Sequence, residues 1–133
     1  MDVTSALFVF FGGGLGALAR WGLGLALNPL FPQLPPGTFA ANVVGGLLMG
    51  CALGAFSQFE TLPPVARLAF TTGFLGGLTT FSTFSAESAQ MLLRGDYRWA
   101  GVHAALHVVA SLAATLGALS ATSAAFRALG GQQ

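Results

Sequence analysis

The sequence is poor in charge and in cysteine. It contains no lysine, only 7% of its 133 residues are charged, and the formal net charge is +1. Because its five arginines form no basic run, the charge pattern gives no support for a nucleic-acid partner. A single cysteine, Cys51, excludes an internal disulfide and a metal site built from cysteines. This residue lies inside an apolar segment, where we expect it to be buried as a small hydrophobic side chain.

Apolar residues dominate the sequence instead. They make up 54% of the chain, and the mean hydropathy of +0.75 is too high for a soluble domain of this length. A helix needs about 20 residues to cross the hydrocarbon core of a bilayer. Four apolar segments reach that length, at about 5–27, 37–57, 65–93 and 98–126. We therefore predict an all-α, multi-pass membrane protein with one four-span domain over residues 1–133.

The third apolar segment carries a local pattern that an ordinary membrane helix lacks. Gly76 and Gly77 are poor helix formers, and the β-branched Thr79, Thr80 and Thr83 can hydrogen-bond back to carbonyls. We predict that the helix is broken here, near the membrane midplane. Irregular backbone persists at that depth only where it is buried in protein or lines a wet cavity, so the break indicates a site for ions or small polar solutes.

The arginines give almost no signal for orientation in the membrane. If both termini lie on one side, that side holds Arg67 and Arg127. The opposite side then holds Arg94 and Arg98, with Arg20 near the end of its span. Orientation depends on a bias in such counts, so this sequence is compatible with insertion in both directions. Four helices are few for enclosing a polar path, and we expect an antiparallel, dual-topology homodimer.

Three polar side chains inside the predicted spans each have two interpretations. The amide of Asn42 needs hydrogen bonds in hydrocarbon, so it either clamps a neighbouring helix or lines a hydrated path. Arg20 lies near the end of its span and could extend to the headgroups. Glu87 could form an interhelical hydrogen bond or pair with Arg20. Both charges are costly inside a membrane, which also makes them functional candidates.

Phe81 and Phe84 are three residues apart and share a helix face directly after the predicted break. Phenylalanines in membrane helices commonly face lipid or core. Next to a break, however, the positive edges of two rings can stabilise an anion without holding it as tightly as an ammonium group would. Free carbonyls at the end of the first half-helix suit a hard cation such as Na⁺, and the start of the second half favours negative charge.

The fourth segment places polar residues at four-residue spacing, so that they share one helix face. These are His103, His107, Ser111 and Thr115. The two histidines are either pore-wall donors or interfacial and packing residues. With no carboxylate within a turn of them, they supply at best two zinc ligands, which argues against a metal-dependent membrane enzyme.

Three motifs together resemble the small bacterial fluoride channels of the Fluc family. They are GGGLGALAR at 12–20, GTFAAN at 37–42 and GGLTTFSTFSAE at 76–87. The first two are weak alone, whereas the third is specific, and the resemblance covers nearly the whole chain. It implies a fluoride-selective channel in the cell inner membrane, with two pores in an antiparallel dimer that let fluoride leave the cell passively.

The resemblance also implies roles for individual residues. Backbone oxygens of Gly76 and Thr79 from both subunits would hold a structural Na⁺ on the two-fold axis. Phe81 and Phe84 would form an aromatic box, and Asn42 would be a pore-lining donor. The polar pathway would further include Arg20 at the vestibule together with Thr38, Ser82, Glu87, Ser111 and Thr115. Where we expect a tyrosine in the fourth span this chain has His103, so assignments there are weaker.

Two other classes compete with this interpretation. A small proton-coupled drug antiporter also has four spans and dual topology, but it needs an ionisable carboxylate in its first span, and this chain has none there. A purely structural membrane protein is compatible with the composition, but such a protein has no need of a broken helix.

Overall fold

The computed structural model describes residues 2–59 and 61–130, and every regular element in these ranges is helical. In chain order the elements are α1 (Val3–Leu27), the 3-10 turn η1 (Asn28–Leu30), α2 (Pro36–Phe56), α3 (Pro64–Leu68), the π-helical η2 (Ala69–Leu75), α4 (Gly76–Leu78), α5 (Phe81–Leu93) and α6 (Tyr97–Gly130). The prediction of an all-α chain is confirmed. Residues 1, 60 and 131–133 of the predicted domain lie outside the described ranges.

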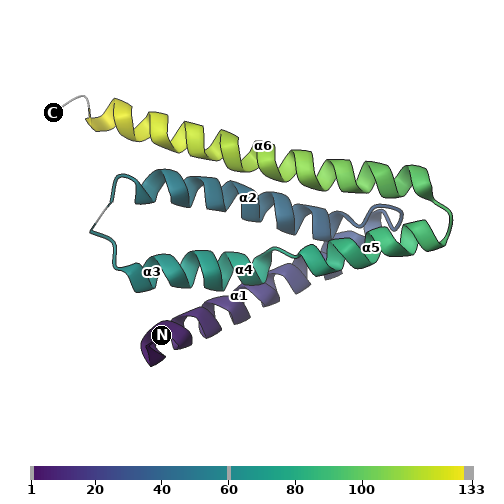
Figure 1. Cartoon of the computed structure of the whole chain (residues 1–133), viewed down its shortest axis with the longest axis horizontal. Coiled ribbons are helices and arrows are strands. Elements are labelled where there is room, and N and C mark those ends of the chain that lie inside the picture. Colours follow the sequence, from purple (N-terminus) through teal and green to yellow (C-terminus); the bar gives the residue numbers. More distant parts are fainter. Residues whose placement is uncertain (1, 60, 131–133) are drawn as a thin grey trace.

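Helices α2 and α6 lie side by side along their length, while α3, α4 and α5 follow one another nearly in line (Figure 1). Small residues let α2 approach α6 closely. A Cβ on Gly46 would lie 2.8 Å from the carbonyl oxygen of Ser111, and one on Gly50 would collide with the carbonyl oxygen of Thr115. No larger side chain fits at these positions unless the helices move apart.

Helix α1 starts below α3 in Figure 1, runs obliquely past α4 and passes behind α5, and it packs on η2 and α4 through a second set of glycines. A Cβ on Gly16 would collide with the Phe74 carbonyl oxygen, and one on Gly77 with that of Gly13. Asp2 caps the start of α1, because its carboxylate accepts hydrogen bonds from the Ser5 amide at 2.6 Å and the Ser5 hydroxyl at 3.0 Å. The same bonds lower the pKa of Asp2.

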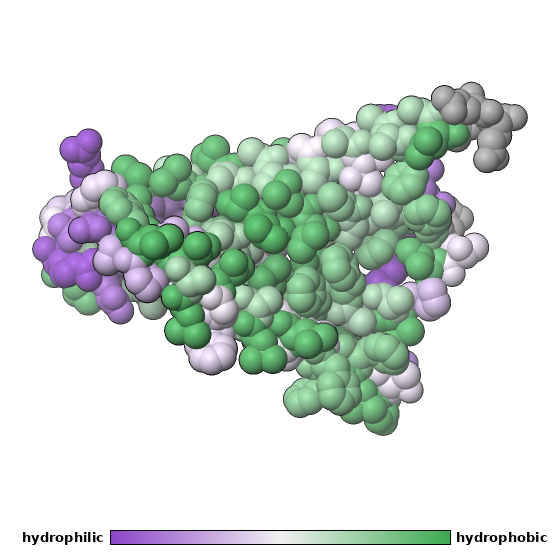
Figure 2. All heavy atoms as spheres, turned by 180° about the vertical axis from the view of Figure 1, so that it is seen from behind, coloured by the Kyte–Doolittle hydropathy of each residue, from purple (hydrophilic) through white to green (hydrophobic). Residues whose placement is uncertain are grey.

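The surface of the chain is that of a membrane protein. Three helices in the described ranges are long and apolar enough to cross a bilayer, namely Val3–Leu30, Pro36–Phe56 and Tyr97–Leu129. Apolar side chains cover most of the face seen in Figure 2, and polar ones gather at the end of the molecule where α5 turns into α6. The prediction that Cys51 is buried is wrong, because this residue is exposed on α2. Gly50 beside it faces α6, so Cys51 points away from that packing surface.

Helical backbone stops at Leu78 and resumes at Phe81. Between them Thr79 (φ −79°, ψ 155°) and Thr80 (φ −149°, ψ 113°) are extended. Gly76 and Gly77, which we expected to disrupt the helix, are helical within α4. Gly77 serves the close approach of α1, and the interruption comes at the two threonines that follow it.

Candidate functional site

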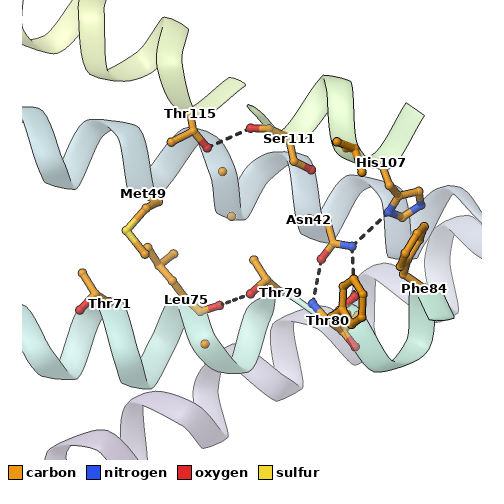
Figure 3. Close-up of a pocket in the computed structure, with 15 residues that line it drawn as sticks. Asn42, Met49, Thr71, Leu75, Thr79, Thr80, Phe84, His107, Ser111 and Thr115 are labelled. Carbon is orange, nitrogen blue, oxygen red and sulfur yellow. Dashed lines mark hydrogen bonds between the residues drawn. The ribbon is translucent and has the colours of Figure 1, made fainter. Parts of the chain in front are cut away.

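The side chain of Asn42 on α2 holds the extended backbone of Thr80 (Figure 3). Its Oδ1 accepts a hydrogen bond from the Thr80 amide at 2.7 Å, and its Nδ2 donates to the Thr80 carbonyl at 3.2 Å. Nδ2 also lies 3.1 Å from Nδ1 of His107 on α6. Of the two interpretations of Asn42 from the sequence, the clamp on a neighbouring segment is observed. Asn42 also borders a pocket, and the hydrated path stays a prediction.

The interruption releases backbone carbonyls from helical hydrogen bonding, and those of Gly76 and Thr79 are among them. In a continuous helix the Gly76 carbonyl would accept from the Thr80 amide, and the Thr79 carbonyl from the Thr83 amide. Here the Thr80 amide donates to Asn42, and the Thr83 amide donates to the Thr80 hydroxyl at 3.1 Å. The carbonyls of the two residues assigned to sodium by resemblance are therefore among those that lose their usual partners.

A pocket of about 440 Å³ lies between α2, α6 and the segment from η2 to α5. Its wall includes nine of the residues singled out from the sequence: Asn42, Gly76, Thr79, Thr80, Phe81, Phe84, His107, Ser111 and Thr115. The ring centroids of Phe81 and Phe84 are 5.5 Å apart, which agrees with a shared face. Phe81 is 78% exposed on the single chain, whereas Phe84 lies with its centroid 4.9 Å from that of His107.

A second pocket, of about 290 Å³, contains Arg20, Thr38, Thr80 and Thr83 in its wall. Arg20 is half-buried, and its Nε donates a hydrogen bond to the Gly77 carbonyl at 3.1 Å. Thr80 is the residue that borders both pockets. The interrupted backbone therefore separates two cavities, each with polar groups in its wall.

Glu87 on α5 lines neither of these pockets. Its Oε1 accepts a hydrogen bond from the Thr38 hydroxyl at 2.6 Å, and its Oε2 lies 3.3 Å from Nε2 of His103. Of the two structural interpretations of Glu87, the interhelical hydrogen bond is the one observed, because Arg20 bonds Gly77 instead. Ser82 is exposed, and its hydroxyl oxygen lies 3.3 Å from that of Thr80.

Two features escaped the analysis of the sequence. The first is the set of partners of Thr80, whose amide and carbonyl bond to the Asn42 side chain and whose hydroxyl bonds to that of Thr83. The second is a cluster that brings Glu87 to both histidines of α6, so the limit of two zinc ligands is wrong. The spacing of His103 and His107 indicated their shared face, but no sequence pattern indicated which carboxylate would meet them.

Comparison with known proteins places the chain in a family. Residues 7–119 match the family model described as CrcB-like protein, Camphor Resistance (CrcB). The chain is 55% identical over 111 residues to the fluoride-specific ion channel FluC of Aromatoleum aromaticum, covering 84% of this chain and 85% of the relative. It is 56% identical over 105 residues to the protein of the same name from Nitrosospira multiformis, covering 79% and 82%. With this much of its length matched, the chain belongs to the CrcB-like family.

Proposed function

We propose that this chain forms a fluoride-selective channel that lets fluoride cross the cell inner membrane passively. The proposal is supported by membership of the CrcB-like family and by relatives 55% and 56% identical that are named fluoride-specific ion channels. Family membership does not favour the proton-coupled antiporter, which also requires a carboxylate that is missing between residues 5 and 27. An ion channel catalyses no reaction, so no residue is assigned to catalysis.

The four spans proposed at about 5–27, 37–57, 65–93 and 98–126 correspond to α1, α2, the series from α3 to α5, and α6. Three of them are continuous apolar helices. The third would be a single span interrupted at Thr79 and Thr80. Its parts follow one another nearly in line in Figure 1. At about 1.5 Å per helical residue, the roughly 30 residues from Pro64 to Leu93 are long enough to cross a bilayer.

The functional unit would be an antiparallel homodimer surrounded by membrane lipid. From these two residues one chain offers two carbonyls, those of Gly76 and Thr79, and Na⁺ needs more oxygen ligands than two. Gly76 is exposed and Thr79 is half-buried, so a second copy related by a two-fold axis could bring its own pair to the same point. Carbonyl oxygens are hard, uncharged ligands that suit Na⁺, and the bound ion would supply a fixed positive charge beside the break.

The anion path would run along the first pocket, past the rings of Phe81 and Phe84 and the hydroxyls of Ser111 and Thr115. Ring edges and hydroxyl groups can replace the water shell of a small anion step by step, and a narrow bore excludes chloride. Arg20 and Thr38 border the second pocket, on the other side of Thr80. In this proposal they form the vestibule, and Ser82 and Glu87 complete the polar pathway.

The observation that carries the proposal is the interrupted backbone at Thr79 and Thr80, with a pocket on each side of it that has polar side chains in its wall. A fluoride electrode applied to liposomes that contain the purified chain tests it. We expect rapid fluoride efflux, little chloride efflux, and no requirement for a proton gradient. Equal rates for the two anions, or the absence of any flux, would refute the channel. Efflux that stops when the proton gradient is dissipated would favour an antiporter.

A further inference from the structure

Three buried polar atoms gather where α5 meets α6, and each lacks a hydrogen-bond partner in the part of the chain that the structure describes. They are Oε2 of Glu87, Nε2 of His103 and Nε2 of His107. The two histidines are only 2% and 5% exposed. Leaving a polar group buried and unpaired costs about 1–3 kcal/mol, so three of them in one place call for a physical explanation.

The neighbours of His103 fix which of its ring nitrogens is free. The Ser88 hydroxyl donates its hydrogen to the Phe84 carbonyl at 2.9 Å, so its oxygen can only accept from Nδ1 of His103, 3.0 Å away. The ring proton of neutral His103 therefore lies on Nδ1, and Nε2 presents a lone pair. That nitrogen lies 3.3 Å from the Glu87 carboxylate oxygen, where a protonated His103 would form an ion pair; with His103 neutral and Glu87 ionised, two acceptors face each other.

Glu87 is oriented in the same manner. The Thr38 hydroxyl donates to its Oε1 at 2.6 Å, which leaves Oε2 toward His103. Hydrogen bonds from outer residues to the far side of a ligand are the usual way in which proteins orient metal-binding histidines and carboxylates. Ser88 therefore orients His103, and Thr38 orients Glu87, as outer residues orient the ligands of a metal ion.

His107 lies one helical turn from His103, with the ring centroids 4.4 Å apart. The ligand atoms that Glu87, His103 and His107 offer all lie within 4.8 Å of one another. Nδ1 of His107 faces the Asn42 amide nitrogen at 3.1 Å and accepts from it in this arrangement. A cation on Nε2 would move the ring proton to Nδ1, so this third ligand can join only if its contact with Asn42 loosens.

We propose that Glu87, His103 and His107 form a binding site for a divalent transition-metal ion, with Zn²⁺ as the best match. Imidazole nitrogens and a carboxylate oxygen are common zinc ligands, and bond lengths of about 2.0–2.2 Å in a tetrahedron place neighbouring ligand atoms about 3.4 Å apart. Glu87 and His103 are already at that spacing. Both histidines also border a pocket of about 220 Å³, which leaves a fourth position for water.

Isothermal titration of the purified, tag-free chain with ZnCl₂ tests the site without any transport step. We expect saturable binding of about one ion per chain. His103→Tyr should weaken it by about 100-fold, because a first ligand matters at least as much as the outer residues whose loss costs 10- to 100-fold. Cys51→Ala is the matched control for the one thiol and should bind as the unchanged chain does. Absence of saturable binding, equal affinity in His103→Tyr, or loss of binding in Cys51→Ala would each overturn the site.

His103→Gln provides a second variant if circular dichroism indicates that His103→Tyr is unfolded, and the same loss of affinity is expected. The effect on transport rests on the proposed function. Zinc should slow fluoride efflux because it draws His107 away from Asn42, and His103→Tyr should lose this inhibition relative to its own zinc-free rate. Zinc binding without any fluoride efflux would refute the channel and leave the metal site in place. Zinc binding without inhibition of efflux would refute the link through Asn42.

Discussion

Replacing Asn42 with alanine should close the interruption in the backbone and stop fluoride efflux. The Asn42 amide supplies both hydrogen-bond partners of the Thr80 peptide groups, at 2.7 and 3.2 Å. Without them the Thr80 amide would find the Gly76 carbonyl, which is its partner in a continuous helix. The same change would withdraw that carbonyl from any cation bound beside the break. We therefore expect a loss of flux together with a change in stability.

The size of the stability change follows from the two bonds. Two buried backbone groups left unpaired would cost about 2–6 kcal/mol at about 1–3 kcal/mol each. Hydrogen bonds between membrane helices average only about 0.6 kcal/mol in double-mutant cycles, because the freed groups find other partners. The pocket beside Thr80 can admit water, which favours the lower values. We expect a loss of about 2 kcal/mol, or roughly 30-fold in the folding equilibrium.

Asn28→Ala provides a comparison for stability alone, because Asn28 accepts a single backbone hydrogen bond, from the Gly37 amide at 2.8 Å, and borders the second pocket. Unfolding in detergent by a graded denaturant, followed by circular dichroism, measures stability, and a fluoride electrode measures efflux. Asn42→Ala should lose more stability than Asn28→Ala and should lose nearly all of its flux. If Asn42→Ala kept both the stability and the efflux of the unchanged chain, the clamp would be wrong.

Three further predictions follow from the same contacts. Phe84→Ile and Phe81→Ile should slow fluoride efflux by at least about tenfold, since they remove the ring edges and keep an apolar side chain. The assembly should stay intact on gel filtration. Full activity in both variants would refute the role of the rings. Gly50→Leu should prevent α2 from packing on α6, because even a Cβ there collides with the Thr115 carbonyl. Gly101→Ala, with open space around it, should fold normally. Equal yields of folded protein from the two variants would contradict this. A tag on the C-terminus should be accessible from both faces of the membrane, and access from one face alone would rule out dual topology.

The composition and the periodic placement of apolar residues were enough to predict an all-helical membrane protein. The local chemistry of the third segment also placed the interruption within a few residues of where it occurs. Within that stretch, the two glycines stay helical and only Thr79 and Thr80 are extended, and this difference has a physical cause. Gly77 was taken as a helix breaker, but lipid and neighbouring helices can hold glycine in a helix, and this glycine is needed where α1 crosses. Low helix propensity alone could not distinguish these two uses of glycine.

Pairings between distant residues were beyond the reach of the sequence. Thr38 and Glu87 are 49 residues apart, and Asn42 and Thr80 are 38 apart. Periodicity states which face of its own helix a residue occupies, but it does not state at what height another helix passes. The zinc argument failed for this reason, because it searched for a carboxylate within a turn of the histidines. The carboxylate that meets them comes from α5, across a turn of the chain.

The position of Asn42 along α2, opposite Thr80, therefore connects the packing of the helices to the interrupted backbone. Two extended residues inside a membrane protein are stable only while side chains satisfy their backbone groups, and at Thr80 that depends on Asn42. Asn42 reaches Thr80 where α2 lies close against the interruption, since a Cβ added to Gly45 would collide with the Thr79 side chain. A larger residue at Gly45 should push α2 away from Thr79 and weaken the hold of the Asn42 amide on Thr80.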